Sequence, residues 1–276
     1  MAQSFTPPSI VVGVDGSRAA VRAALWAVDE AVGRGLALRL VAAAEPGTDA
    51  AAAESAVRAA AAAIESSGCS ELPAVTTDVI AGPPLAALLA AARTATMICV
   101  GAVGLRHFER GRVGSTAGAL IGAAHCPVAV VRGGQRPASV PSGWVVAELD
   151  QTPESAAVLQ FAVEEARLRR CPLRVLGTWQ SGDHDAHTPE SDRVVRANLD
   201  RRLETWKHRY PDLDVEPVAV PGGGLDYLSD NAASIQLVVI GAGNTAGLGE
   251  LFGPAGLAAL HDTDCTILVV DRQRLL

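Results

Sequence analysis

Lysine is nearly absent from this chain of 276 residues: Lys207 is the only one, and arginine supplies the other positive charges. The formal net charge is −7 at pH 7, and the sequence pI is about 5.4. General affinity for nucleic acid depends on clustered Lys and Arg that meet phosphates, so this balance argues against a nucleic-acid partner. A Walker-type phosphate loop is excluded as well, because no G-x-x-x-x-G-K-[ST] segment occurs.

Aromatic residues are also scarce, at 4% of the chain, whereas 49% of the residues are hydrophobic. This composition favours helices packed tightly on sheets by small side chains such as alanine, and not an aromatic-rich binding surface. The cysteines are five in number, and none forms a C-x-x-C pair: Cys69, Cys99, Cys126, Cys171 and Cys265. A disulfide framework or a structural zinc site is therefore not expected.

Long uninterrupted apolar runs are missing, because Glu, Arg and Ser break the alanine-rich segments. No membrane span is expected from this pattern. The first 17 residues have no basic start followed by a long apolar stretch, so no secretory signal is visible. We therefore expect a soluble protein of the reducing cytoplasm, without a membrane partner.

The chain repeats itself once. Three segments return in the same order: IVVGVDGS (10–17) as WVVAELDQT (144–152), TMICVGAVG (96–104) as LVVIGAGN (237–244), and HCPVAVVRG (125–133) as DCTILVVDR (264–272). The offsets are nearly constant, at 135 from Asp15 to Asp150, 140 from Gly101 to Gly241 and 139 from Cys126 to Cys265. Two homologous halves are indicated, and not a solenoid of shorter repeats.

The segment between the halves is rich in Gly, Pro and Ser and has no apolar periodicity. It predicts a linker at residues 133–142, which separates a first domain at 1–132 from a second at 143–276. The final strands expected in the two domains, 128–131 and 266–270, could pair with each other and bury both edges. That pairing would make an intramolecular pseudo-dimer, and a homodimer of chains is a further possibility.

Apolar Val/Ile runs alternate with helical segments in the first half. Strands are expected at 10–14, 37–44, 74–82, 97–101 and 128–131, and helices follow Ser17, Asp49, Pro83 and Ser115, the first of them ended by Gly33 and Gly35. This order predicts two tandem doubly wound parallel sheets of five strands, with a Rossmann-like α/β fold. Ligands of such sheets lie beyond the carboxyl ends of the strands, where Asp15 and Gly101 fall.

The stretch Gly101-x2-Gly104-x9-Gly114-Ser115 admits two interpretations. Gly101 and Gly104 lack a Cβ and would let the backbone turn sharply and approach a ligand. Gly114 opens a helix whose first amides point outward, and Ser115 and Thr116 add hydroxyls, which together suit a phosphate. The alternative is a long surface loop without a ligand.

The same loop is positively charged although the chain as a whole is negative. It contains Arg106, His107, Arg110 and Arg112 against the single acid Glu109. These arginines could assist in holding phosphate, or they could form the solvated face of a plain loop. Spacing alone leaves both interpretations open.

Asp15 also has two interpretations. Its carboxylate could accept hydrogen bonds from a ribose, as acids do in dinucleotide folds. Alternatively, Asp15-Gly16-Ser17 is a turn that caps the next helix. Adjacent central strands would bring Asp15 and Gly101 to one crevice, which favours a shared ligand.

These motifs together, VVGVDGS, the complete glycine pattern and HCPVAVV, resemble the universal stress proteins of the ATP-binding type, and the repetition is similar to that of their tandem members. The resemblance implies an adenine nucleotide, ATP with or without Mg²⁺, across the carboxyl edge of the sheet. Asp15 would meet the ribose and Val41 the adenine. The phosphates would be met by Gly101, Gly104, Gly114, Ser115 and Thr116. The resemblance also implies pairing through the last strands, a role in stress survival or dormancy, and little or no catalysis.

The second half departs from this pattern. Gly241 matches Gly101, but Asn244, which could still adopt a left-handed turn, replaces Gly104, and Pro254-Ala255 replaces Gly114-Ser115. Proline removes an amide donor and alanine removes a hydroxyl. The loop TAGLGELFG between them has no arginine and carries Glu250.

The first strand of the second half carries a further difference. Glu148 stands where the first half has Gly13. Gly13 is one of the residues of the expected nucleotide site. Two residues before Asp150, Glu148 should share its strand face and add a bulky anion near the ribose. We expect one nucleotide per chain, bound by the first domain.

Three classes of function remain. The sequence favours an ATP-binding regulatory protein over a slow ATP-hydrolysing enzyme or a partner-binding protein with a vestigial site. A missing lysine and the lack of an acidic metal cluster in the loop argue against efficient catalysis. His184 and His187 lie among acids, but we expect a polar loop there and no metal site.

Overall fold

The computed structural model forms two compact units, Met1–Gly134 and Gln135–Leu276. The described residues are 8–45, 50–103, 114–132, 143–150, 155–179, 189–221, 223–260 and 263–271. The expected linker at 133–142 lies outside them. No helix in these ranges is both long and apolar enough to cross a membrane.

The first unit alternates strands and helices. In chain order its described elements are β1 (Ser9–Gly13), α1 (Arg18–Arg34), β2 (Ala37–Ala44), α2 (Ala50–Glu65), β3 (Val75–Ala81), α3 (Pro84–Ala92), β4 (Ala95–Gly101), α4 (Ser115–Ala123) and β5 (Val128–Val131). Each of these strands overlaps a segment that the sequence predicted to be a strand. One boundary differs: α1 continues through Gly33, and only Gly35, with φ 64°, ends it.

The strands of the first unit form a parallel sheet in the order β3-β2-β1-β4-β5. Val12 of β1 lies between Leu40 of β2 and Cys99 of β4. The strand order reverses between β1 and β4, so the carboxyl ends of these two strands meet at the switch point of the sheet. The expected doubly wound α/β fold is confirmed.

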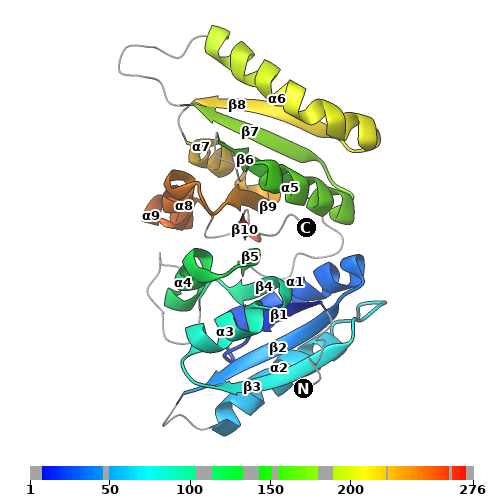
Figure 1. Ribbon diagram of the computed structural model, residues 1–276, viewed down its shortest axis with the longest axis vertical. Helices are drawn as coiled ribbons and strands as arrows, with labels where there is room; N and C mark the ends of the chain where they lie inside the picture. The colour runs from blue at the N-terminus through cyan, green and yellow to red at the C-terminus, as the bar shows by residue number, and fades with distance from the viewer. Residues whose placement is uncertain are drawn as a thin grey trace, which may run out of the picture. The chain divides into compact units, whose positions relative to one another are not determined.

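Helices cover both faces of this sheet. Ile10, Val11 and Val12 have no exposed surface, although successive side chains of a strand point to opposite faces. Helix α1 packs on β1 and β4 beside α2, and α3 packs on β2 beside α4 (Figure 1). The buried face of α1 is mostly alanine, which lets the helix approach the sheet closely.

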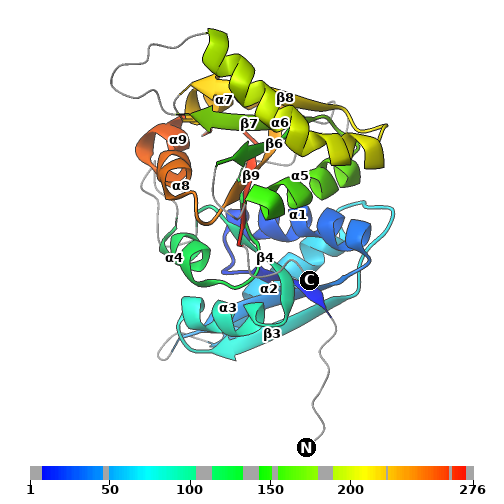
Figure 2. The ribbon, with the colours of Figure 1, turned by 45° about the horizontal axis from the view of Figure 1, so that its top comes forward.

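The second unit repeats this plan. Its described elements are β6 (Trp144–Leu149), α5 (Ser155–Arg169), β7 (Leu173–Trp179), α6 (Pro189–Arg209), β8 (Val215–Pro221), α7 (Leu225–Asp230), a 3-10 turn (Ala232–Ser234), β9 (Ile235–Gly241), α8 (Thr245–Phe252), α9 (Pro254–Ala259) and β10 (Thr266–Val270). Its strands are parallel in the order β10-β9-β6-β7-β8. Helices α8 and α9 lie side by side (Figure 1 and Figure 2).

We predict that Gly101→Ala destabilises the protein by about 1–3 kcal/mol, because a Cβ at position 101 would lie 2.6 Å from the carbonyl carbon of Ala19 in α1. Gly122→Ala in α4 is the matched control, since a Cβ there meets nothing within 4 Å. In a helix this second change should stabilise the chain by about 0.5–1 kcal/mol. Urea unfolding followed by circular dichroism compares the two; equal midpoints would contradict the packing role of Gly101.

Candidate functional site

The candidate site of the first unit lies at the switch point between β1 and β4. Asp15 follows β1 by two residues, and Gly101 is the last residue of β4. Because these strands are neighbours and parallel, both residues lie at the same carboxyl edge of the sheet. The structure therefore brings together the two motifs that the sequence placed in one crevice.

Asp15 forms the helix-capping turn. Its Oδ1 accepts a hydrogen bond from the amide of Ser17 at 2.9 Å, and Ser17 Oγ accepts one from the amide of Ala20 at 3.1 Å. Gly16 has a φ of 84°, which explains the glycine between them. Asp15 is nevertheless exposed, so the turn presents the carboxylate at the edge of the sheet instead of hiding it.

The two glycines in the strands serve internal packing. A Cβ at Gly101 would collide with the backbone of Ala19, and a Cβ at Gly13 would lie 3.0–3.1 Å from side-chain atoms of Leu88 and Val100. Neither glycine has a positive φ within the described backbone. Neighbouring elements thus occupy the space that a side chain would need at either glycine. For Gly101, the sequence analysis had suggested close approach to a ligand as the reason for the missing Cβ.

Helix α4 begins at the same edge without a side-chain cap. The amide of Gly114 donates to the carbonyl of Ala102 at 2.9 Å, so this amide is not available to a ligand. Among the described residues, no acceptor reaches the amides of Ser115, Thr116 or Ala117. Ser115 is exposed and Thr116 half-buried. The first turn of α4 therefore offers amide and hydroxyl donors toward solvent.

Two other parts of the expected site are Gly104 with its arginine-rich loop and Val41. Gly104 and the arginine-rich loop at 104–113 lie outside the described residues. Val41 has no exposed surface, and its carbonyl accepts the amide of Val14 at 2.9 Å. Val41 therefore presents no surface that an adenine could contact in this structure.

The corresponding edge of the second unit is filled by its own side chains. Glu148 of β6 is 5% exposed, and its Oε1 accepts a hydrogen bond from Asn244 Nδ2 at 3.1 Å. Asn244 Oδ1 in turn accepts the amide of Gly247 at 2.9 Å and caps α8. The left-handed turn considered for Asn244 is wrong: its φ is −79°, because the residue serves as a helix cap.

Two glycines make room for the Glu148 carboxylate. A Cβ on Gly224 would lie 2.9 Å from Glu148 Oε2, and a Cβ on Gly247 would lie 2.9 Å from Oε1. The segment expected as the loop TAGLGELFG is mostly helix α8, since the Asn244 cap satisfies its first turn. The sequence did not reveal these partners, because Gly224 and Asn244 are far from Glu148 in the chain.

At the start of α9, the second unit has fewer hydrogen-bond donors than the first unit has at the start of α4. Pro254 is the first residue of α9 and has no amide to offer, and Gly253 caps the helix without a side chain. Asp150 Oδ1 accepts the hydroxyl of Ser155 at 2.9 Å, which ties this acid to the start of α5. The edge thus holds a buried acid where the first unit has the side-chain-free Gly13.

The family of the chain follows from comparison with known proteins. The model of the universal stress protein family matches residues 8–132 and again residues 145–271. The chain belongs to the universal stress protein family. Universal stress protein Rv2028c from Mycobacterium tuberculosis is 44% identical over 100% of both chains, and Rv2624c from the same organism is 38% identical over 97% of both.

Solved structures agree on the fold of this tandem universal stress protein. A universal stress protein from Archaeoglobus fulgidus matches with a TM-score of 0.66 at 15% identity, covering 96% of both chains. A protein described as a putative universal stress protein from Pseudomonas aeruginosa matches at 0.62 and 18%, covering 97% of this chain and 94% of the other. Membership is consistent with a role in the stress response, and the family is generally non-enzymatic.

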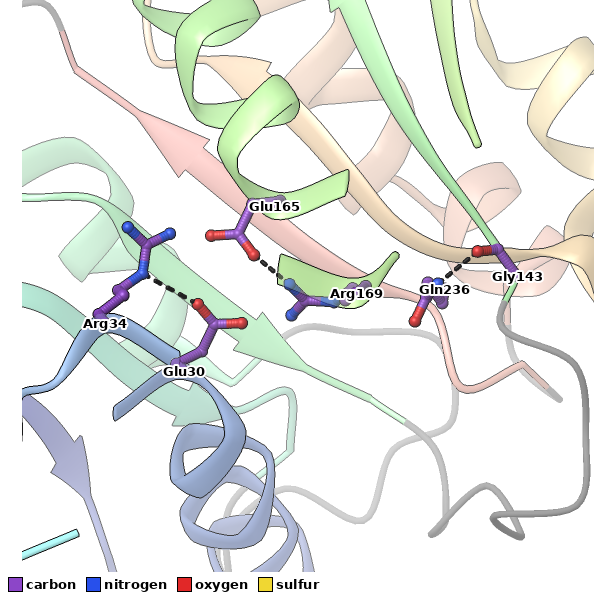
Figure 3. A network of polar contacts seen from close by, with 6 residues as sticks. All are labelled: Glu30, Arg34, Gly143, Glu165, Arg169 and Gln236. Atoms are coloured by element: carbon purple, nitrogen blue, oxygen red, sulfur yellow. Dashed lines mark hydrogen bonds and ion pairs between the residues drawn. The ribbon is translucent and has the colours of Figure 1, made fainter. Parts of the chain in front are cut away.

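Each unit of the universal stress protein also carries a buried acid that the sequence analysis missed. Glu30 pairs with Arg34 on α1 at 3.2 Å, and Glu165 pairs with Arg169 on α5 (Figure 3). Both glutamate side chains have 0% exposure, and the second pair follows the first by 135 residues. A buried carboxylate is costly without a cation, so the repeated i,i+4 spacing was the available signal.

Within the described ranges, no group of three His, Cys, Asp or Glu side chains is arranged to hold an ion. The segment with His184 and His187 lies outside those ranges. Acidic side chains interact with one another at the filled edge. Burial raises the pKa of Glu148, with further raising by Glu250 and Asp150, and the Asn244 hydrogen bond only partly opposes this.

We predict that Glu148→Gln stabilises the protein increasingly as the pH rises. The folded chain protonates Glu148 at a pH where the unfolded chain, with an ordinary pKa of 4.5, is still ionised. The contribution of Glu148 to stability is therefore full below 4.5 and is lost as the pH rises through the folded pKa. Glutamine keeps the acceptor for Asn244 and removes this loss.

The measurement is the urea midpoint of both proteins between about pH 5 and pH 8. Glu71→Gln, an exposed glutamate in the first unit, is the control and should follow the parent protein. A constant difference between parent and Glu148→Gln across this range would show that the acid does not titrate there.

Proposed function

We propose that the first unit binds ATP across the carboxyl edge of its sheet, and that the second unit binds none. Occupancy of this one site would regulate the protein during stress adaptation or growth control. The first turn of α4 carries the proposal, because it has no side-chain cap and because Ser115 is exposed at the carboxyl edge of the sheet, where Asp15 also lies.

In this proposal, the phosphates are bound by the amides and hydroxyls of Ser115 and Thr116, where the positive end of the α4 dipole favours negative charge. The amide of Gly114 donates its hydrogen bond to the carbonyl of Ala102, so it does not bind phosphate. Asp15, exposed at the end of β1, is the residue for the ribose hydroxyls. We include Gly104 and the loop arginines among the residues that bind phosphate because of their positions in the glycine motif.

Regulation, and not turnover, is the proposed use of the nucleotide. Phosphoryl transfer depends on positioned cations and an oriented nucleophile. The chain's one lysine, Lys207, belongs to α6 of the second unit and pairs there with Asp200. The described residues also contain no group of three His, Cys, Asp or Glu side chains that could hold an ion. Any Mg²⁺ would then arrive bound to the phosphates of ATP. None of the five cysteines, all of them in the described ranges, is part of a disulfide, which suits a reducing cytoplasm.

We expect Ser115→Glu to weaken ATP binding by about tenfold or more, because a carboxylate at this position repels phosphate and a charge-assisted hydrogen bond is lost. An acid in the first turn of a helix is favourable for folding, so the variant should remain stable. Ala255→Glu is the matched control: it places the same acid in the first turn of α9 and should leave affinity unchanged.

Isothermal titration calorimetry of the full chain with ATP gives both affinity and stoichiometry. The proposal expects about one nucleotide per chain, removed by Ser115→Glu alone. Two nucleotides per chain, or equal losses in the Ser115 and Ala255 variants, would overturn the assignment to the first unit. Mass spectrometry of ligand released from protein purified without added nucleotide identifies the natural occupant.

A further inference from the structure

A second candidate site lies in the second unit, at the amino ends of β7 and β8. A hollow of about 550 Å³ opens there where α5 and α6 end. It is lined by the ends of both helices and the turns that follow them: Ala166, Arg167, Arg170, Cys171, Pro172, Arg209, Tyr210, Pro211, Asp212, Leu213 and Asp214. The nucleotide proposed above would lie at the opposite, carboxyl edge of a sheet in the other unit.

Three arginines of this hollow have no acidic partner in the described part of the chain. Arg167, Arg170 and Arg209 take part in none of its ion pairs. Neighbouring arginines behave differently, since Arg169 pairs with Glu165. Three guanidinium groups around one hollow, with no acidic partner among the described residues, are an excess of positive charge that a bound anion would neutralise.

An aromatic ring holds two of these groups in place. The guanidinium carbon of Arg167 lies 3.9 Å from the centroid of the Tyr210 ring, and that of Arg209 lies 5.4 Å from it. Trp206 stacks on the same ring with centroids 6.1 Å apart. Stacking on a ring orders arginine while leaving its N–H donors available, which lowers the entropy lost on binding.

Arg170 has an unusual backbone for an arginine. Its φ is 50°, and it is the one residue other than glycine with a positive φ among those described. It ends α5 as Gly35 ends α1: the Cys171 amide bonds Ala166 at 3.0 Å, as the Leu36 amide bonds Ala31 at 2.8 Å. Glycine suits this position better, so the second repeat keeps an arginine against local preference.

The positive charge is specific to the second repeat. At the constant offset of 135, the first repeat has Val32 and Gly35 where the second has Arg167 and Arg170. The connection from α2 to β3, residues 66–74, contains no Lys, Arg or His. The shared fold therefore does not demand this cluster.

The acids of the hollow do not cancel its charge. Asp214 already accepts a hydrogen bond from Arg174 Nη1 at 3.3 Å, which leaves Asp212 against three arginines. Burial raises the pKa of the Cys171 thiol, so it adds no negative charge. The carboxyl ends of α5 and α6 attract cations, but their partial charges do not amount to an anion.

We propose that this hollow binds a small polyanion that carries phosphate groups, held by Arg167, Arg170 and Arg209. The site differs from the nucleotide site in its unit, in its edge of the sheet and in its chemistry, which uses guanidinium groups instead of main-chain amides. Its occupant would touch the Tyr210 turn and the end of α5.

Trp206 is a built-in reporter for the test. The full chain is titrated with sodium pyrophosphate at constant ionic strength, kept constant with sodium chloride, while tryptophan fluorescence is recorded. We expect a saturable change that Trp206→Phe abolishes. Arg167→Gln and Arg209→Gln should each weaken binding by about tenfold or more. Arg201→Gln, an exposed arginine of α6 that does not line the hollow, is the matched control and should bind normally.

Arg170→Gly separates the proposal from a structural role. Glycine relieves the positive φ, so this variant should unfold at a temperature equal to or above that of the parent while it binds pyrophosphate more weakly. No saturable change at millimolar pyrophosphate, or an equal loss in Arg201→Gln and Arg167→Gln, would overturn the site. Ser115→Glu should leave the Trp206 response intact, which keeps this result independent of ATP binding.

Discussion

The close contact between α1 and the end of β4 is the constraint on which the first unit's candidate site depends. Only a residue without a Cβ fits at Gly101, because the backbone of Ala19 already occupies that space. This contact holds the start of α1 against the switch point of the sheet. The capping turn of Asp15 and the chain that leaves β4 toward α4 must therefore begin at the same edge, so the donors of α4 and the carboxylate of Asp15 share one neighbourhood.

The second unit keeps the framework and reverses the chemistry of the same edge. Glu148 replaces a glycine, and Gly224, Gly247 and Asn244 together accommodate its carboxylate. A buried carboxylate facing two other acids is costly in its ionised form, which is why its pKa is raised. Glu148 thus fills the space at this edge and hydrogen-bonds the residue that caps α8, so its partners lie within the second unit itself.

Apolar runs and turn residues were enough to predict most elements of the first unit, because parallel strands buried on both faces appear as continuous Val/Ile segments. The switch point followed from strand order. The structural reason for each glycine could not be predicted from the sequence. The contacts of Gly13 with Leu88 and of Gly101 with Ala19 join separate elements, so they leave no pattern in the local sequence. Helix α8 was missed because Gly247 and Gly249 resemble loop residues when the Asn244 cap is unknown.

Scarcity of lysine shapes both proposed sites. A chain with net charge −7 and one lysine has to bind anions mainly with main-chain amides, hydroxyls or arginine. In a parallel α/β sheet, the amino ends of helices gather at the carboxyl edge, where uncapped amides can bind phosphate without any cation. The amino edge collects the carboxyl ends of helices, whose dipoles repel anions, so a site there requires side-chain charge. The first turn of α4 in the first unit and the three arginines in the second unit follow this division, because main-chain amides are available at the carboxyl edge and side-chain charge is needed at the amino edge.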